Sequence, residues 1–355
     1  MSAPRVLIVG AGALGLGFLL ERLAGTCEAV LADRNEQREL LERIERERGY
    51  TVSICGPDRA TIRRVEGHFR AVFTDDPGGA AAFEEAVARS PIILTATGRS
   101  VLPQLVPMLG SALRATGGRH AVLFCENGVH LAAEHGPALG PSARAVDTVM
   151  SRMCRFADPD EDHYEPLWPG SPYRLVAEEY TLMPVADSPA WRTQASGAGI
   201  SLPDALTAMD AGRFRYWEDV KVYMHNAMHA FVAYHDALEG VRSFPGTPQH
   251  IRDAAHSVMM EEVVPSVVRH HPRVSSRETR EYAGALLERF YNPWFAESVE
   301  RGIRGTAEKL VPGGRLRGGV DYIREAGIEP VGFEAVVKAA EQMLACREDA
   351  VHGGR

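Results

Sequence analysis

Lysine is almost absent from this sequence. Of its 39 basic Lys and Arg residues only three are lysines, namely Lys221, Lys309 and Lys338. An arginine keeps its proton at any physiological pH, whereas a desolvated lysine can release one. A lysine in the polar stretch KVYMHNAMH, residues 221–229, therefore suggests a proton acceptor. From this stretch alone, the alternative that Lys221 is a solvated helix residue stays open.

Cysteines and long apolar runs are also scarce. The five cysteines are odd in number, scattered and without CxxC spacing. This excludes a disulfide framework or a zinc knuckle and predicts reduced thiols in a cytoplasmic protein. The N-terminus begins like a secretory signal, but glycines interrupt its apolar run and no small-residue cleavage site follows. No stretch approaches the ~20 apolar residues of a membrane span.

The chain has no excess of positive charge. Its formal net charge is −8, which argues against a broad nucleic-acid or anionic-membrane surface. The 45% hydrophobic and 24% charged residues are typical of a globular protein. A length of 355 residues suggests roughly two domains. A monomer or a small homo-oligomer acting on a small molecule fits these properties.

The first half of the chain alternates between strand and helix patterns. The predicted strands are apolar runs that end in Gly or polar residues, and most are followed by helical periodicity. This alternation predicts an α/β fold with a Rossmann-type, doubly wound parallel sheet. Residues 50–56 and 60–67 predict a small antiparallel excursion, while 145–153 and 174–186 are candidates to extend the sheet. The predicted parallel strands and helices are strands 5–10, 27–33, 90–98 and 120–128, and helices 14–25 and 35–49.

Helical periodicity dominates the second half. From about Pro189 onward there is little strand pattern, and long helical segments begin near residues 218, 249, 276 and 333. We therefore expect a dinucleotide-binding domain over 1–190 and a mostly α-helical substrate domain over 191–355.

A glycine motif lies between the first predicted strand and helix. Gly10 permits the tight turn, Gly12 lets backbone approach a pyrophosphate, and Gly15 allows close helix–strand packing. The helix N-terminus offers N–H groups to the phosphates. Asp33 ends the second strand, where an acid binds the ribose hydroxyls and repels a 2′-phosphate. NAD is therefore expected over NADP, although Arg34 beside it would tolerate a phosphate.

Lys221, Asn226 and His229 share a predicted helix. On a regular α-helix they fall within an arc of about 140°, so all three can face one cleft. A neutral lysine can accept an alcohol proton if burial and positive neighbours lower its pKa. Amide N–H groups can hold the developing alkoxide.

Together these segments resemble the polyol-specific long-chain dehydrogenases, the mannitol dehydrogenase family, and in length its branch that acts on phosphorylated polyols. The resemblance runs through most of the chain. It rests on GAGALGLGF (10–18), TATG (95–98), CENGV (125–129), KxxxxNxxH (221–229), RFYNP (289–293) and VERGIRGTAEKL (299–310).

The resemblance implies an NAD-dependent, metal-independent dehydrogenase of CH–OH groups. It makes Lys221 the general base, Asn127 and Asn226 the pair that stabilises the oxyanion, and His229 a ligand of a substrate hydroxyl. It also places Thr97 at the cofactor. The alternatives from the residues alone are a loop cap for Asn127 and a core histidine for His229.

The resemblance further implies that Arg301 and Lys309 line the substrate site. Two positions depart from the family: Ser151 replaces an acid that contacts substrate in some members, and Gly314 stands where Asp is common. These changes leave open a sugar-alcohol phosphate such as mannitol 1-phosphate, a free polyol, a cyclitol phosphate or a uronate. Arg304, and likewise Arg315 and Arg317, can bind a phosphate through bidentate contacts or be solvated.

Three other functions compete with this interpretation. His225 and His229, at i and i+4, could ligate zinc, but no third ligand has suitable spacing. A 6-phosphogluconate- or ketopantoate-type dehydrogenase also combines a Rossmann domain with a catalytic lysine, but its asparagine follows the lysine by four residues, whereas here it follows by five. A dinucleotide-binding sensor or scaffold would not need the Lys, Asn and His side chains that are intact here.

Overall fold

The computed structural model describes residues 5–187, 189–197 and 206–352. Contacts divide the chain into two compact units, Met1–Phe214 and Arg215–Arg355. The division falls later than the boundary at residue 190 expected from the sequence. Trp191 and Ala195 lie in the core of the first unit, and a short strand near residue 206 pairs within it, so this segment stays with the first unit.

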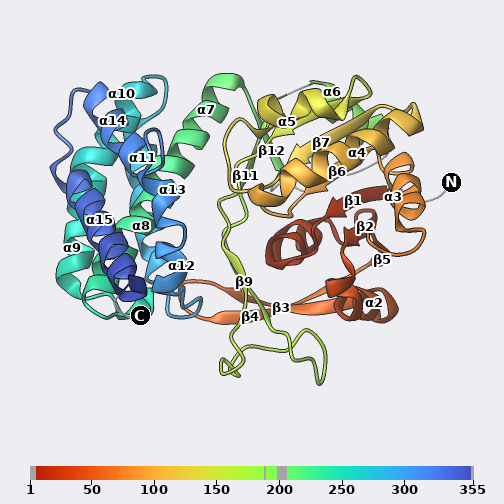
Figure 1. Cartoon of the computed structure of the whole chain (residues 1–355), viewed down its shortest axis with the longest axis horizontal. Coiled ribbons are helices and arrows are strands. Elements are labelled where there is room, and N and C mark those ends of the chain that lie inside the picture. The colour runs from red at the N-terminus through yellow and green to blue at the C-terminus, as the bar shows by residue number, and fades with distance from the viewer. Residues whose placement is uncertain (1–4, 188, 198–205, 353–355) are drawn as a thin grey trace. The chain divides into compact units, whose positions relative to one another are not determined.

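A six-stranded parallel sheet forms the centre of the first unit (Figure 1). Its order is β5-β2-β1-β6-β7-β8, which confirms the expected doubly wound architecture. The strand order reverses between β1 and β6, and in open α/β sheets ligands bind outside the carboxyl ends of the strands at such a switch point. The edge strand β5 has no counterpart among the strands expected from the sequence. The bounds are β1 Arg5–Val9, β2 Glu28–Asp33, β5 His68–Phe73, β6 Ile92–Thr95, β7 His120–Phe124 and β8 Ala143–Asp147.

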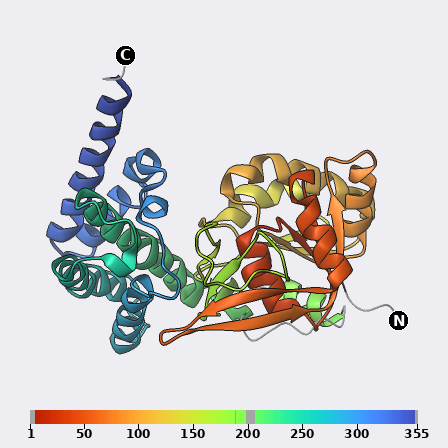
Figure 2. The same cartoon turned by 90° about the horizontal axis from the view of Figure 1, so that it is seen from below.

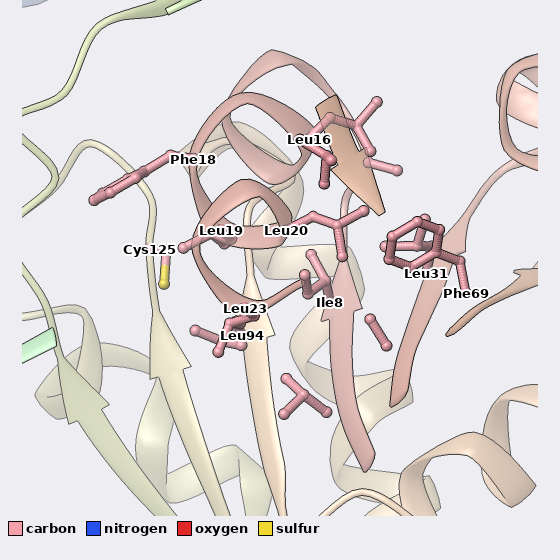
Figure 3. Packing of buried hydrophobic residues seen from close by; sticks show 14 of the residues in the cluster. Ile8, Leu16, Phe18, Leu19, Leu20, Leu23, Leu31, Phe69, Leu94 and Cys125 are labelled. Carbon is pink, nitrogen blue, oxygen red and sulfur yellow. The ribbon is translucent and has the colours of Figure 1, made fainter. Parts of the chain in front are cut away.

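Apolar cores cover both faces of this sheet. Successive strand residues point to opposite faces, so Ile8 of β1 joins one core and Leu7 the other. Leu16, Leu19 and Leu20 of the helix after β1 pack on the first face, as Figure 3 shows. The helical segments of this unit are η1 Gly15–Leu20, α1 Glu21–Leu23, η2 Asn35–Gln37, α2 Arg38–Glu47, α3 Gly79–Ala88, η3 Arg99–Val101, α4 Leu102–Thr116, α5 Leu131–Leu139 and α6 Pro189–Gly197.

A second sheet of four strands has the order β4-β3-β10-β9. The antiparallel hairpin of β3 (Gly49–Cys55) and β4 (Ala60–Glu66) is confirmed, and it is the long orange ribbon of Figure 2. The expectation that 174–186 extends the parallel sheet is wrong. Its two strands lie in other sheets, where Val176 pairs with Ser53 and Met183 pairs with Leu206. These partners are remote in sequence, so the local pattern did not reveal them. The bounds are β9 Cys154–Phe156, β10 Leu175–Glu178, β11 Met183–Ala186 and β12 Leu206–Met209.

The described part of the second unit is mostly helical, as expected. Its long rods each contain a π-helical segment, η4 in one and η6 in the other. Glu262 of η6 accepts the first N–H groups of α15, at 2.6 Å from Gly332 and 3.0 Å from Phe333. None of the described helices is long and apolar enough to cross a membrane. The segments are α7 Ala211–Asp219, which crosses the division, η4 Val220–Asn226, α8 Ala227–Leu238, η5 Phe244–Gly246, α9 Gln249–Val258, η6 Met259–Val263, α10 Val264–His270, α11 Ser276–Phe290, α12 Val299–Ile303, α13 Thr306–Leu310, α14 Arg317–Glu325 and α15 Val331–His352.

Candidate functional site

The glycine turn after β1 has the geometry of a phosphate cradle. Gly10 has φ of +99°, and a Cβ there would lie 2.6 Å from the Ala96 carbonyl carbon. A Cβ on Gly15 would lie 2.1 Å from the Gly10 oxygen, so both positions require glycine. A Cβ on Gly12 would meet no atom within 4 Å. Open space beside Gly12, at the start of the helix, fits a pyrophosphate group.

Asp33 lies at the end of β2 beside this turn. Its Oδ2 accepts a 2.7 Å hydrogen bond from the Ala11 N–H, and its Oδ1 accepts one of 2.8 Å from the Arg34 N–H. A carboxylate has about four acceptor positions, so Asp33 retains capacity for ribose hydroxyls. The Arg34 guanidinium pairs with Glu36 at 2.6 Å on the surface. The residues present therefore fit an adenosine dinucleotide.

Glu126 joins the ends of β6 and β7, a role that the sequence analysis missed. Its Oε2 accepts a 2.7 Å bond from the Thr95 hydroxyl, and its Oε1 accepts a 3.1 Å bond from the Thr97 N–H. Burial raises the pKa of Glu126, although these bonds oppose the shift. Thr97 is half-buried, and Asn127 is exposed immediately after Glu126. The only sequence signal was the position of Glu126 within CENGV.

Ser151 does not present its side chain to solvent. It is fully buried, and the next residue, Arg152, donates a 2.7 Å bond to Glu21 and a 2.6 Å bond to the Glu178 carbonyl. Both charged side chains of the Arg152–Glu21 pair are buried. This buried pair fixes the segment after β8 to the helix of the glycine turn. The substrate contact expected for Ser151 has no exposed surface to support it in this structure.

Lys221 and Asn226 lie in the π-helical segment η4 of the second unit. The Ala227 N–H bonds the Val222 carbonyl, five residues back. In a π-turn, residues five apart are stacked as residues four apart are in an α-helix, about 40° apart around the axis rather than about 140°. The structure thus places Lys221 and Asn226 closer on one face than the α-helical estimate from the sequence. Both side chains are half-buried, as is His229.

His229 is held between aromatic rings and cations. Its ring lies 4.5 Å from Phe244 and 5.3 Å from Phe290 between centroids. Burial, together with the charges of four basic residues, lowers the pKa of His229 to about 3, so the ring is neutral at physiological pH. Its Nε2 is buried with no hydrogen-bond partner among the described residues. A substrate hydroxyl would satisfy this atom. The four basic residues are Arg301, Lys221, Lys309 and Arg315.

Lys309 and Arg301 flank His229 from α13 and α12. Lys309 is only 6% exposed, donates to the Gly302 carbonyl and lies 5.6 Å over the Tyr234 ring. Burial and the nearby Arg315 lower the pKa of Lys309 to about 8. Arg301 Nη1 lies 3.6 Å from the buried carboxylate of Glu297.

The remaining arginine candidates differ in environment. Arg315 is half-buried and contributes to the lowered pKa values of His225 and His229. Arg317 is exposed and pairs with Glu341 of α15 at 2.6 Å. Arg304 is exposed. Arg315 is therefore the best-placed of the three for a substrate anion.

Gly314 is required by its turn. A Cβ there would lie 2.7 Å from the Glu308 carbonyl oxygen and 2.8 Å from that of Val311. Glycine at this position therefore allows a tight backbone turn. An aspartate here would have to open that turn.

The zinc alternative is disfavoured by electrostatics. His225 is buried, and burial together with Lys221 and Arg289 lowers its pKa well below the usual value. A site surrounded by these cations repels a divalent ion. Within residues 5–187, 189–197 and 206–352, no three His, Cys, Asp or Glu side chains are grouped to hold a metal.

Residues 214–331 match the family model described as "Mannitol dehydrogenase C-terminal domain". The chain is 24% identical over 342 residues to a mannitol-1-phosphate 5-dehydrogenase of Emericella nidulans, covering 94% of this chain and 84% of that protein. It is 26% identical to the enzyme of that name from an Arthrobacter species, with 93% and 84% covered.

Two solved structures that it resembles are a dehydrogenase and a reductase. Mannitol 2-dehydrogenase of Pseudomonas fluorescens, in ternary complex with NAD and D-mannitol, superposes with a TM-score of 0.73 at 16% identity, covering 96% of this chain and 78% of that chain. A 2-dehydropantoate 2-reductase from Geobacter metallireducens gives 0.55 at 14% identity, covering 96% and 99%. The predicted enzyme class, an oxidoreductase of CH–OH groups, is confirmed. The predicted resemblance to the mannitol dehydrogenase family is thus confirmed: the model of its C-terminal domain matches residues 214–331, and the similarity to named dehydrogenases extends over nearly the whole chain.

Proposed function

We propose that the protein interconverts a sugar-alcohol phosphate, such as mannitol 1-phosphate, and its ketose phosphate, with NAD as the hydride acceptor. Lys221 Nζ takes the proton of the reacting hydroxyl while hydride leaves the same carbon, so that the C–OH bond becomes C=O. The nicotinamide supplies only the hydride acceptor. In reduction Lys221 returns the proton to the oxygen.

Two asparagines and one histidine support this step in the proposal. Amide N–H groups of Asn226, and of Asn127 from the first unit, stabilise the negative charge that develops on the oxygen. The neutral ring of His229 exchanges a hydrogen bond with a second substrate hydroxyl, because its Nε2 has no partner among the described residues. Arg301 and Lys309 orient the remaining hydroxyls.

The observation that carries the phosphate is the charge around His229. Lys221, Lys309, Arg301 and Arg315 all lower its pKa. Basic side chains gathered around one ring give the site a positive potential, which attracts an anion. A phosphate supplies about −2 charge and three strong acceptor oxygens, which basic side chains bind tightly.

Asp33 supports NAD over NADP. A 2′-phosphate beside its carboxylate would be repelled, and the neighbouring Arg34 guanidinium is paired with Glu36.

The test is oxidation of NADH at 340 nm with fructose 6-phosphate, with fructose and NADPH as matched controls. Turnover that requires both the phosphate and NADH is the expected result. Equal rates with fructose contradict the phosphate, and equal rates with NADPH contradict the cofactor preference. NADH binding without turnover on either sugar would contradict the sugar-alcohol phosphate.

A cyclitol phosphate or a uronate is the second candidate. The observation that favours it is the lack of an acidic side chain at Ser151 and Gly314, the two positions that depart from the family. Turnover of a cyclitol phosphate but not of fructose 6-phosphate would select it. The ketopantoate-type alternative has lower structural similarity, with a TM-score of 0.55 against 0.73 for the mannitol dehydrogenase.

A further inference from the structure

A cluster on the second unit holds the first turn of η4. Asp219, the last residue of α7, accepts a 2.9 Å hydrogen bond from the Tyr322 hydroxyl of α14 and a 2.7 Å bond from His271 Nε2. Asp219 stands two residues before Lys221. The bond therefore fixes the helix at the point where the π-turn begins.

The Tyr322 ring is stacked on both sides. The Tyr223 ring of η4 lies 4.1 Å from it at 22°, and the His270 ring lies 4.0 Å from it at 27°. His270 Nε2 also lies 3.0 Å from the Tyr322 carbonyl oxygen. Tyr322 thus holds Asp219 through its hydroxyl and Tyr223 through its ring, and these two residues bracket Lys221.

A π-turn accommodates one residue more than an α-helical turn, and such turns are rare and frequently lie at functional sites. The extra residue must be absorbed somewhere along the rod, because α8 is tightly packed: Met228, Val232 and Tyr234 are fully buried. Without an anchor, the wide turn could shift along the rod. Each one-residue shift changes the angle between two side chains by about 100°.

We propose that Tyr322 is a positioning residue for the reaction, because it fixes the π-turn at 220–226 and so keeps Lys221 and Asn226 on one face. Asp219, Tyr223 and Tyr322 form the clamp, and none of these three residues reacts with the substrate. This inference rests on the proposed function, in which Lys221 and Asn226 act together on one oxygen.

The test is Tyr322→Phe, which removes the hydroxyl but keeps the stacked ring. We expect NADH affinity and Tm close to those of the wild type and turnover lower by about 10-fold, since small misplacements of reacting groups cost up to about 100-fold. Tyr216→Phe is the matched control, because it loses a buried hydroxyl bond to Thr279 of 3.3 Å in the same unit. It should keep wild-type turnover.

A double-mutant cycle with Asn226→Ala separates positioning from general damage. If Tyr322 acts through Asn226, then Tyr322→Phe causes little further loss in the Asn226→Ala background. If the turnover losses of the two single variants multiply in the double variant, the proposal is overturned. Wild-type turnover of Tyr322→Phe also overturns it. If Tyr322→Phe does not fold, Asp219→Ala removes the acceptor of the same bond.

Amine labelling gives a readout that does not need turnover. With only three lysines, mass spectrometry can follow each one. We expect Tyr322→Phe to change the labelling rate of Lys221 relative to the exposed Lys338, and Tyr216→Phe to leave the ratio as it is. An unchanged ratio in Tyr322→Phe overturns the clamp, whereas a changed ratio in a protein that turns over no sugar supports the clamp and rejects the proposed function.

Discussion

Lys221→Arg separates positive charge from proton transfer. Arginine keeps the charge and most of the length of the side chain but does not deprotonate at physiological pH. We expect the variant to fold, to bind NADH and to turn over at least ~100-fold more slowly, since general acid–base catalysis contributes about 10²–10⁴-fold. Initial rates and NADH titrations measure both quantities.

The matched control is Lys338→Arg, because Lys338 is exposed on α15. It should have wild-type rates. Near-normal turnover of Lys221→Arg would remove the lysine from the role of base, whatever the control does.

Arg315 and Arg317 make a second residue-scale comparison. Arg315 lowers the pKa values of His225 and His229, whereas Arg317 pairs with Glu341. If Arg315 binds the substrate phosphate, Arg315→Leu should raise KM for the phosphorylated sugar about 10–100-fold, the value of a charged hydrogen bond of about 1.5–3 kcal/mol. Arg317→Leu should leave KM unchanged. The opposite ranking would place the phosphate elsewhere.

The neutral state of His229 has a consequence for stability. Its folded pKa of about 3 lies below the ordinary histidine value of 6.5, so the unfolded chain binds the extra proton. Stability from this residue is full above pH 6.5 and is lost as pH falls toward 3. Between pH 7.5 and 5 the loss is about 2 kcal/mol, at about 1.4 kcal/mol per pKa unit.

Urea unfolding at pH 7.5 and 5 tests this directly. His229→Leu should lose less stability between the two pH values than the wild type. An equal loss in both proteins would show that His229 is not buried in the neutral form.

At the scale of elements, the glycine turn after β1 gives opposite predictions for two alanines. Gly15→Ala places a Cβ 2.1 Å from the Gly10 oxygen, so it should lower the free energy of unfolding by about 1–3 kcal/mol. Gly12→Ala meets no atom within 4 Å, so stability should not change. NADH affinity should nevertheless fall on the order of 10-fold, because the methyl group occupies the space for the pyrophosphate.

Urea melts and NADH titrations of both variants check the two expectations. Unchanged NADH affinity in Gly12→Ala would move the phosphates away from this turn.

The same scale shows what the sequence could predict. The parallel strands 5–10, 27–33, 90–98 and 120–128 were predictable, because buried apolar runs ending in Gly or polar residues are local signals. The pairing of β10 with β3 was not, since Val176 and Ser53 are remote in sequence and a short apolar run does not specify its sheet. The π-turn at 220–226 was also missed, because helical periodicity assumes about 3.6 residues per turn.

The candidate site was predicted unevenly for a related reason. Motif positions such as Gly12 and Lys221 were found because their chemistry is carried by residue type and spacing. Glu126 and Tyr322 were not, because each acts through contacts that only the folded chain brings together. The burial of Ser151 likewise depends on packing, and a sequence comparison does not contain it.

At the scale of the whole molecule, two units with their own cores predict two thermal transitions rather than one. The glycine turn and Asp33 lie in the first unit, so NADH should stabilise that transition. Saturation at 100 times Kd stabilises a binding unit by about 2.7 kcal/mol. Scanning calorimetry with and without NADH measures the shift, and hydrogen exchange assigns it to residues.

The expected protection on binding NADH centres on β1, η1 and the end of β6. Helices α10 and α14 of the second unit should exchange as they do without ligand, and Gly12→Ala is the control that should reduce the effect. A single transition that NADH moves as a whole would show that the two units unfold cooperatively. Protection confined to the second unit would instead reject the dinucleotide site, because NADH would then not bind beside Gly12.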